Sequence, residues 1–325
     1  MTKKIEKIAV LTSGGDAPGM NPCIRAVVRT ALAQGIQVAG IQGGYEGLIQ
    51  GNFEMMGARD VGGILQRGGT ILCTARSKEF RERQGQMKAI RQLNNESIDG
   101  LVVIGGDGSI NGAQKLVEQG VNVIAIPASI DNDIFGTDMC IGVDTALNTI
   151  VDAIDKLRDT ASSHNRAFLV ETMGRLSGYL AIHAGIVVGA EMVLIPEISF
   201  TVDEIASVVD HAYLRGKNHA IIVAAEGVKP SVNELAAMIE ERNLGFHLRV
   251  SILGHIQRGG SPTAFDRMLA SRMGYKAVEF ITSEHQGVMT GLVGSIIAPV
   301  PISDVVSRKK SVNMDYIEMA RQLAK

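Results

Sequence analysis

Residues 101–118, LVVIGGDGSINGAQKLVE, hold the pattern on which the fold prediction rests. The short apolar run Leu101–Ile104 is followed by two glycines and then by a segment, Ile110–Glu118, whose apolar residues recur at helical spacing. Brief, nearly continuous apolar runs are typical of strands buried on both faces of a parallel sheet. The stretch therefore predicts a strand, a glycine turn and a helix in succession.

The same alternation recurs along the chain on both sides of this stretch. Further runs predicted as strands are Ile8–Leu11, Val38–Ile41, Val123–Ile126, Phe168–Val170, Met192–Ile195, Ala220–Ala224, Leu248–Leu253 and Leu292–Ile297. Further segments predicted as helices are Ile24–Ala33, Ala146–Arg158, Val202–Arg215 and Ser231–Glu241. Asn21 is the predicted N-cap of the first helix, with Pro22 at its first position. This alternation predicts right-handed βαβ units and an α/β fold.

Composition limits the classes of function. At roughly 150 residues per domain, a chain of 325 residues is predicted to form two domains. Its 46% of hydrophobic residues supply a core and exclude intrinsic disorder. A net charge of −2, 4% aromatic residues and the lack of tryptophan argue against binding to nucleic acid or anionic lipid. Glycine is in excess, with 37 residues, or about 11% against a typical 7% or so.

The three cysteines, Cys23, Cys73 and Cys140, are far apart and form no CxxC pair. This pattern predicts neither a disulfide framework nor a zinc site. The charged N-terminus leads directly into a predicted strand, without the apolar run of a signal peptide, and no apolar stretch is long enough to span a membrane. We therefore expect a reduced, soluble, cytoplasmic protein.

Two glycine-rich turns lie between a predicted strand and a predicted helix. Residues 12–21, TSGGDAPGMN, form the first and residues 105–109, GGDGS, the second. Free amides at a helix N-terminus and small glycines suit a phosphate group. Asp107 in the second turn is a candidate Mg²⁺ ligand, because Mg²⁺ is usually held by one or two carboxylates and the phosphates of a substrate. The alternatives are a tight turn without ligand at the first segment and a capping aspartate at the second.

Two further segments carry groups suited to phosphoryl transfer. Residues 127–133, PASIDND, place Asp131 and Asp133 two residues apart, so that one carboxylate can accept a proton while the other positions metal or base. An Asx-rich turn is the alternative there. Residues 254–262, GHIQRGGSP, combine His255 and Arg258 as a phosphate clamp. A purely structural histidine is the alternative for His255. Other candidate cations, among which spacing alone does not select, are Arg76, Arg166, Arg175 and Arg249.

Taken together, these four segments and Met173–Arg175 resemble the bacterial ATP-dependent 6-phosphofructokinases, over a region from Ile8 to about Gly291. The resemblance implies a Mg²⁺-dependent transfer of the γ-phosphoryl group of ATP to the 1-hydroxyl of fructose 6-phosphate, a step of glycolysis. It also implies two similar Rossmann-like three-layer lobes with mostly parallel sheets and the active site in the cleft between them. The larger, ATP-binding lobe would comprise 1–141 and 257–307, and the smaller, fructose 6-phosphate-binding lobe 142–256 and 308–325. A homotetramer is expected.

The resemblance implies a role for each matching residue. The ATP site would contain Gly15, Arg76, Ser77, Gly106, Asp107, Gly108 and Ser109, with Asp107 as the metal ligand. The catalytic groups would be the base Asp131, the cations Arg76 and Arg175, and Asp133 near the metal. The sugar would contact Ser129, Ile130, Asp131, Met173, Gly174, Arg175 and Glu226. The 6-phosphate would bind His255 and Arg258 from one subunit and Arg166 and Arg249 from its neighbour.

The chain departs from the family pattern at several positions. Ala128 stands where ATP users usually have glycine and pyrophosphate users lysine, and Ser129 replaces threonine. Gly108, where pyrophosphate users tend to have aspartate, favours ATP, so pyrophosphate dependence is the alternative. Ser77 replaces a usual aromatic residue, which bears on nucleotide affinity.

The family's effector site binds ADP or phosphoenolpyruvate between subunits. Positions matching that site are Arg25, Arg29, Arg158, Glu191, Arg215, Lys217 and His219. Ala58 and Gly63 stand where arginine and aspartate are usual, so we expect a weakened effector response. A weakly active regulatory paralogue is a further alternative, but the carboxylates Asp107, Asp131 and Asp133 are all present. A lipid or NAD kinase would leave residues 255–260 without a purpose.

Overall fold

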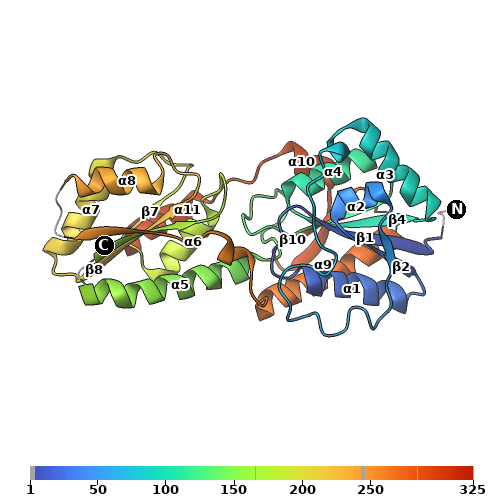
Figure 1. Cartoon of the computed structure of the whole chain (residues 1–325), viewed down its shortest axis with the longest axis horizontal. Helices are drawn as coiled ribbons and strands as arrows, with labels where there is room; N and C mark the ends of the chain where they lie inside the picture. Colours follow the sequence, from blue (N-terminus) through green and yellow to red (C-terminus); the bar gives the residue numbers. More distant parts are fainter. Residues whose placement is uncertain (1–3, 165, 243–245, 284, 325) are drawn as a thin grey trace. The chain divides into compact units, whose positions relative to one another are not determined.

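The computed structural model describes residues 4–164, 166–242, 246–283 and 285–324, which fall into two compact units (Figure 1). Unit 1 comprises the described residues up to Ser129, together with Asp133–Thr145 and Arg258–Lys310. Unit 2 comprises Ile130–Asn132, Ala146–Gln257 and the described residues from Ser311 onward. The divisions thus fall slightly later in the chain than the predicted crossings at 141, 256 and 307. The grouping of residues 130–132 with unit 2 had no counterpart in the prediction.

Unit 1 is built on a sheet that has seven strands among the described residues. Their order is β11(Ile296–Pro301), β10(Val288–Val293), β5(Val123–Pro127), β4(Gly100–Gly105), β1(Lys7–Ser13), β2(Gln37–Ile41) and β3(Phe53–Met55). β3 and β11 run antiparallel to their neighbours, and the strands between them are mutually parallel. The central strands β4 and β5 are buried along their whole length, as their apolar sequences predict.

The register of the central strands places the predicted motifs side by side. Ser13 at the end of β1 pairs with Gly105 at the end of β4, and Gly105 pairs in turn with Pro127 at the end of β5. Ligands of open α/β sheets bind outside the carboxyl ends of the strands. The segments that follow these three strands therefore leave the sheet at one edge.

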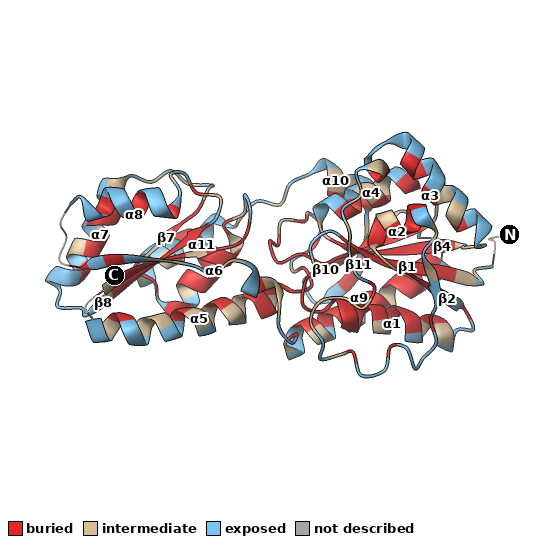
Figure 2. Ribbon diagram, viewed as in Figure 1, coloured by how far each residue is buried: buried red, intermediate tan, exposed pale blue. Residues whose placement is uncertain are grey.

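Helices cover both faces of this sheet (Figures 1 and 2). They are α1(Met20–Ala33), α2(Gly44–Gln50), α3(Arg83–Asn95), α4(Asp107–Val117), α9(Ala264–Thr282) and α10(Ile302–Ser307), with the start of α5(Val143–His164). α1 and α9 lie together on one face, and α2, α3 and α4 lie on the other. A Cβ at Gly274 would lie 2.8 Å from both Cβ of Ala26 and the carbonyl oxygen of Cys23 in α1, so this glycine permits the close approach of α9 to α1.

Unit 2 has a sheet of four strands among its described residues, all parallel. Their order is β7(Met192–Leu194), β8(His219–Ala225), β6(Arg166–Thr172) and β9(His247–Ile252). The accompanying helices are α5, α6(Tyr179–Val188), α7(Val202–Leu214), α8(Val232–Glu240) and α11(Met314–Leu323). Capping boxes at Thr201 and Ser231 fix the starts of α7 and α8, where the sequence predicts them. Both units are thus α/β with largely parallel sheets, as predicted.

Two local predictions were wrong. The run Leu292–Ile297 is not one strand, because Gly294 adopts a left-handed conformation with φ 60° and turns β10 back into β11. Asn21 is not the N-cap of α1, because the helix begins at Met20, two residues earlier than predicted, with Gly19 as its N-cap. The Asn21 amide instead donates to the carbonyl oxygens of Arg67 and Gly68, and its oxygen accepts from the amide of Ile71 at 2.8 Å. Tertiary partners therefore outcompete the local capping role.

In the part of the chain that the structure describes, no helix has both the length and the apolar character needed to cross a membrane.

Candidate functional site

The two glycine-rich turns of unit 1 contact each other at the sheet edge. A Cβ added to Gly14 would lie 3.0 Å from the Ser109 hydroxyl, and one added to Gly105 would lie 2.5 Å from the Ser13 carbonyl oxygen. Both values are too short for ordinary packing, so the loops after β1 and β4 approach this closely only because glycine occupies these positions. The two predicted phosphate-binding segments are therefore parts of one surface.

Helices α1 and α4 begin directly beyond these turns. α4 follows Gly106, which has no side chain to cap it, and Asp107 and Gly108 form its exposed first turn. Asp107 is therefore not the N-cap, and its Oδ1 accepts from Asn111 Nδ2 at 3.1 Å. Two helix N-termini with backbone N–H groups at one edge give a site suited to anionic oxygens.

The loop that carries Arg76 is tied to the same edge. The Thr12 hydroxyl, near the end of β1, donates to the Cys73 carbonyl oxygen at 3.0 Å. Ser77 is half-buried, and its Oγ accepts from the amide of Phe80 at 3.1 Å. The Arg76 side chain is exposed. The loop therefore presents a guanidinium from a backbone that is anchored on both sides.

The carboxylate loop continues from β5 with its own backbone pairing. The Ile141 amide donates to the Pro127 carbonyl oxygen at 3.0 Å, and the Ser129 amide donates to the Ile141 carbonyl oxygen at 3.1 Å. These bonds hold the chain immediately before Ile130 and Asp131. Asn132, between the two carboxylates, has a left-handed backbone conformation with φ 49°. Asp133 is half-buried.

In unit 2, Asp131 lies beside an arginine. Its side chain is 4% exposed, and its Oδ2 is 3.4 Å from Nε of Arg175, whose side chain is 59% exposed. Arg175 has φ 54°, a conformation that costs a non-glycine residue about 1–2 kcal/mol. Backbone strain of this kind is concentrated at functional sites. A nearly buried carboxylate thus has a cation within reach that is held in an unusual backbone geometry.

The strained segment after β6 is held by Glu226. Its Oε1 accepts from the amides of Gly174 at 3.2 Å and Arg175 at 2.6 Å, while its own amide donates to the Thr172 carbonyl oxygen at 2.8 Å. Gln257 holds the preceding residue, because its Oε1 accepts from the amide of Met173 at 3.1 Å. Gln257 lies within the 254–262 motif, but the sequence pattern predicts no role for it. Only its burial and this long-range bond reveal one.

The two members of the predicted phosphate clamp have different surroundings. His255 is exposed in a 3-10 helix, Gly254–Arg258. Arg258 Nη1 donates to the Asp16 carbonyl oxygen at 3.1 Å and lies 2.5 Å from the position a Gly15 Cβ would take. The Arg258 guanidinium thus contacts the glycine turn after β1, and this contact is another reason for glycine at position 15.

Arg166 and Arg249 are not brought to the Met173–Arg175 segment of the same chain. Arg166 is the first residue of β6, and Phe168, two residues later, is paired with Arg249. Seven residues of extended strand separate Arg166 from Met173 by about 23 Å, at 3.3 Å per residue. A single chain therefore leaves these two arginines far from the segment after β6.

Five of the seven predicted effector residues belong to unit 2. Glu191 is 5% exposed and accepts from Lys217 Nζ at 2.9 Å and from the amide of Ile221 at 2.6 Å. Arg158 donates to the Val188 carbonyl oxygen. Burial lowers the pKa of His219, and the charges of Arg158 and Lys217 lower it further, against an opposing effect of Glu191.

The remaining effector candidates have simpler contacts. Arg215 donates from Nε to the His211 carbonyl oxygen at 3.3 Å in unit 2. Arg25 and Arg29 lie on α1 in unit 1, where Arg29 donates to the carbonyl oxygen of Ala58, the departing position, at 3.3 Å. Gly63, the second departure, has φ 66° and open space around it.

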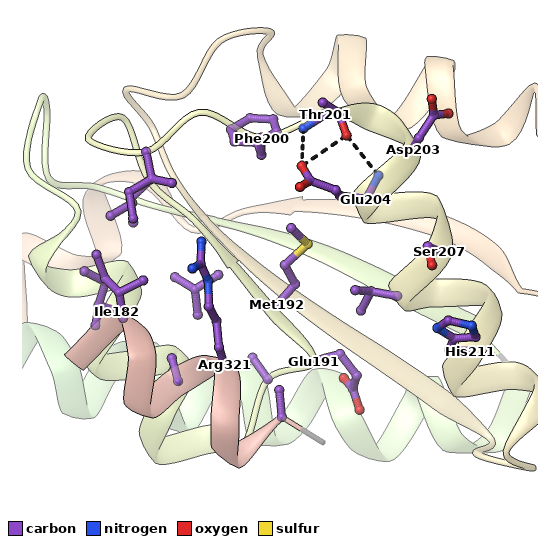
Figure 3. A pocket seen from close by; sticks show the side chains of 18 of the residues that line it. Ile182, Glu191, Met192, Phe200, Thr201, Asp203, Glu204, Ser207, His211 and Arg321 are labelled. Carbon is purple, nitrogen blue, oxygen red and sulfur yellow. Dashed lines mark hydrogen bonds between the residues drawn. The ribbon is translucent and has the colours of Figure 1, made fainter. Parts of the chain in front are cut away.

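Unit 2 contains a large cavity (Figure 3). Its volume is about 1070 Å³, and α6, β7, α7 and α11 line it. Glu191 and Arg215 belong to its wall, and the capping box of Thr201 and Glu204 forms another part. The cavity therefore adjoins the effector candidates, whereas Asp131 and Arg175 are not part of its lining.

The residues at the edge of unit 1 fit a nucleotide-bound metal rather than a protein cage. Among the residues that the structure describes, no group of three or more His, Cys, Asp or Glu side chains is arranged to hold a metal ion. Mg²⁺ at a phosphate site needs only one or two carboxylates, because phosphates and water complete its shell. Asp107, exposed in the first turn of α4, satisfies this requirement.

Comparisons with known proteins show the family of the chain. Residues 7–281 match the family model described as Phosphofructokinase. A protein of Halothermothrix orenii named ATP-dependent 6-phosphofructokinase is 50% identical over 98% of this chain and 100% of its own length. A protein of the same name from Thermotoga neapolitana is 52% identical over the same shares. The crystal structure of Pichia pastoris phosphofructokinase in the T-state superposes with a TM-score of 0.89 at 36% identity, covering 94% of this chain and 36% of the yeast chain.

Proposed function

The chain belongs to the phosphofructokinase family, and on that premise we propose that it transfers the γ-phosphoryl group of ATP to the 1-hydroxyl of fructose 6-phosphate. The products are fructose 1,6-bisphosphate and ADP. The observation that carries the proposal is the nearly buried Asp131 carboxylate with Arg175 3.4 Å away. Phosphoryl transfer needs a base for the attacking hydroxyl and positive charge around the transferring group, and little covalent help.

Unit 1 binds the donor in this proposal. The backbone amides of the turns at Gly15 and at Gly106–Ser109 hold the phosphates, and Arg76 and Ser77 extend the site from their anchored loop. Asp107, supported by Asp133, would hold Mg²⁺, and the ion would neutralise part of the phosphate charge. The exposure of Asp107 and the contact between the two turns support this assignment.

The acceptor is bound mainly by residues of unit 2. Asp131 accepts the proton of the 1-hydroxyl, and Arg175 stabilises the negative charge that develops on the transferring group. Ser129, Ile130, Met173, Gly174 and Glu226 contact the sugar, and His255 and Arg258 bind its 6-phosphate. Glu226 acts through the backbone of Gly174 and Arg175 as well, as its hydrogen bonds indicate.

A neighbouring subunit completes the acceptor site. Arg166 and Arg249 lie far along their strands from the segment after β6, so within one chain they have no part in binding the sugar. We assign them to the 6-phosphate of an adjacent subunit in a homotetramer. Sedimentation of the purified protein tests the assembly, and a monomer with full activity would contradict it.

The effector site binds ADP or phosphoenolpyruvate weakly. Its cations in unit 2 are grouped around Glu191, but Ala58 and Gly63 supply neither the guanidinium nor the carboxylate that the family has there. We expect a nearly hyperbolic dependence of rate on fructose 6-phosphate. A strongly sigmoidal curve relieved by ADP would contradict this.

An enzyme that uses ATP and a free sugar phosphate is placed in the cytoplasm.

The donor and acceptor are tested in one coupled assay. ATP and pyrophosphate are compared as donors with fructose 6-phosphate, and tagatose 6-phosphate is then compared as acceptor with ATP. We expect the highest kcat/KM for ATP with fructose 6-phosphate. A higher kcat/KM for pyrophosphate would replace the donor assignment, and no turnover with either donor would overturn the function.

A further inference from the structure

Asp266 is a fully buried carboxylate that the roles above do not use. It is the third residue of α9. Its Oδ1 accepts from the amide of Gly142 at 2.9 Å, and its Oδ2 accepts from the amide and the hydroxyl of Thr145 at 2.8 and 2.6 Å. Three donors from one short segment, residues 142–145, thus converge on one side chain. This segment begins α5.

Thr263 ties the same two helix starts together from the other direction. Its amide donates to the Thr145 hydroxyl at 3.1 Å, and its own hydroxyl donates to Asp144 Oδ2 at 2.6 Å. The Thr263 hydroxyl also accepts from the Asp266 amide at 3.2 Å, which caps α9. The beginnings of α5 and α9 are therefore linked by side chains of both.

The segment that Asp266 holds is packed against the glycine turn after β1. A Cβ added to Gly142 would lie 2.7 Å from Cβ of Ala17 and 3.2 Å from Cδ of Pro18. A Cβ added to Gly19 would lie 2.5 Å from Cγ2 of Ile141. The backbones are in such close contact that a shift of residues 141–142 would displace the turn that leads into α1.

The same segment also supports the approach to Asp131. Ile141 is bridged to Ala128 and exchanges backbone hydrogen bonds with Pro127 and Ser129, two residues before Asp131. One short piece of chain therefore contacts both the predicted phosphate turn and the strand end that carries the proposed base.

We propose that Asp266 is a positioning residue for phosphoryl transfer, which holds residues 141–145 so that the turn after β1 and the start of the Asp131 loop keep their relative places. The inference rests on the proposed function of the chain. Asp266 touches neither reactant in this role and acts through the backbone it fixes.

If this interior position were purely structural, an apolar side chain would stabilise the fold better than a carboxylate. Burying a carboxylate is costly unless hydrogen bonds compensate, and burial raises the pKa of Asp266 even though its three hydrogen bonds lower it. An asparagine amide in its place turns an N–H group toward the Gly142 and Thr145 donors, so at least one of these donors loses its acceptor. Asp266→Asn therefore loosens the held segment without changing the volume of the side chain.

The experiment compares Asp266→Asn with two other variants of the full chain. Thr145→Val removes the hydroxyl that donates to Asp266 and accepts from the Thr263 amide, but it keeps both backbone amide bonds to Asp266. This variant replaces the first one if Asp266→Asn does not fold. Asp99→Asn is the matched control, because Asp99 Oδ2 also accepts from two backbone amides, those of Glu6 and Lys7, at the opposite end of β1. Stability in urea, kcat and KM for both substrates, and the Kd of Mg-ATP without sugar are measured for each.

We expect Asp266→Asn to lower kcat by 10-fold or more and to weaken Mg-ATP binding several-fold, with a smaller change of the same sign in Thr145→Val. Asp99→Asn should lose stability with unchanged kcat and Kd. If Asp266→Asn and Thr145→Val lose stability but keep wild-type kcat and Kd, the positioning role is overturned. If the wild type fails to phosphorylate fructose 6-phosphate, the proposed function fails, and the Kd of Mg-ATP in the variants decides the inference by itself.

Discussion

Replacing Glu226 by glutamine tests whether a carboxylate holds the strained segment after β6. Glu226 Oε1 accepts two backbone amides, and one of them belongs to Arg175 at φ 54°. A left-handed conformation costs a non-glycine residue about 1–2 kcal/mol, so these bonds must offset that cost. Hydrogen bonds to an ionised acceptor are roughly twice as strong as neutral ones.

The size of the effect follows from these contacts. Glutamine keeps an acceptor oxygen but loses the charge, which removes about half of the strength of two bonds. Because Glu226 is exposed and water competes there, we take the loss as about 1–2 kcal/mol, or roughly 5- to 30-fold. We expect kcat/KM for fructose 6-phosphate to fall by this factor, while KM for ATP is unchanged.

The assay needs a readout that does not involve the sugar. In the substrate-free protein, TROSY NMR should show the Gly174 and Arg175 amide protons moving upfield in Glu226→Gln as their bonds weaken. Glu234→Gln is the control, since Glu234 also accepts a backbone amide, that of Ser231 at 2.8 Å, but at the start of α8. Unchanged amide shifts together with an unchanged kcat/KM would refute the reasoning.

Three further changes have defined outcomes. Asp131→Asn should lower kcat by about 100-fold or more with fructose 6-phosphate binding retained, because the loss of a general base typically costs 10²–10⁴; near-normal turnover in steady-state kinetics would remove Asp131 as the base. Gly105→Ala should lower the thermal midpoint and raise KM for ATP, because its Cβ would lie 2.5 Å from the Ser13 carbonyl oxygen and overpacking costs about 1–3 kcal/mol. Burial, and then the charge of Glu226, raise the pKa of Glu171 above 4.5. The wild type therefore loses stability as the pH rises through that pKa and the side chain ionises. Glu171→Gln should be more stable than wild type in urea at neutral pH and lose this advantage near pH 4.5. An equal difference in the free energy of unfolding between variant and wild type at both pH values would contradict this.

Sequence patterns predicted the strands of both sheets well where burial alone defines them. Leu101–Ile104 lies within β4, and Val123–Ile126 lies within β5, because a strand buried on both faces needs little more than a short apolar run. The sequence patterns gave wrong predictions at two places where the conformation or the partners of a single residue decide the local structure. The run Leu292–Ile297 is apolar across a turn that only the conformation of Gly294 reveals. Asn21 has the composition of an N-cap but finds its partners in a loop about fifty residues away.

The sequence alone predicted the succession of strand, glycine turn and helix. It also predicted which groups suit phosphate and proton chemistry, because both features depend on residues that are adjacent in the chain. The contacts that bring these groups together into a site could not be predicted from the sequence. Glu226 meets the backbone of Gly174 at a separation of 52 residues, and Asp266 meets that of Gly142 at 124. Such partners depend on which strands become neighbours and in what register, and that is decided by the burial of the whole sheet rather than by any local pattern.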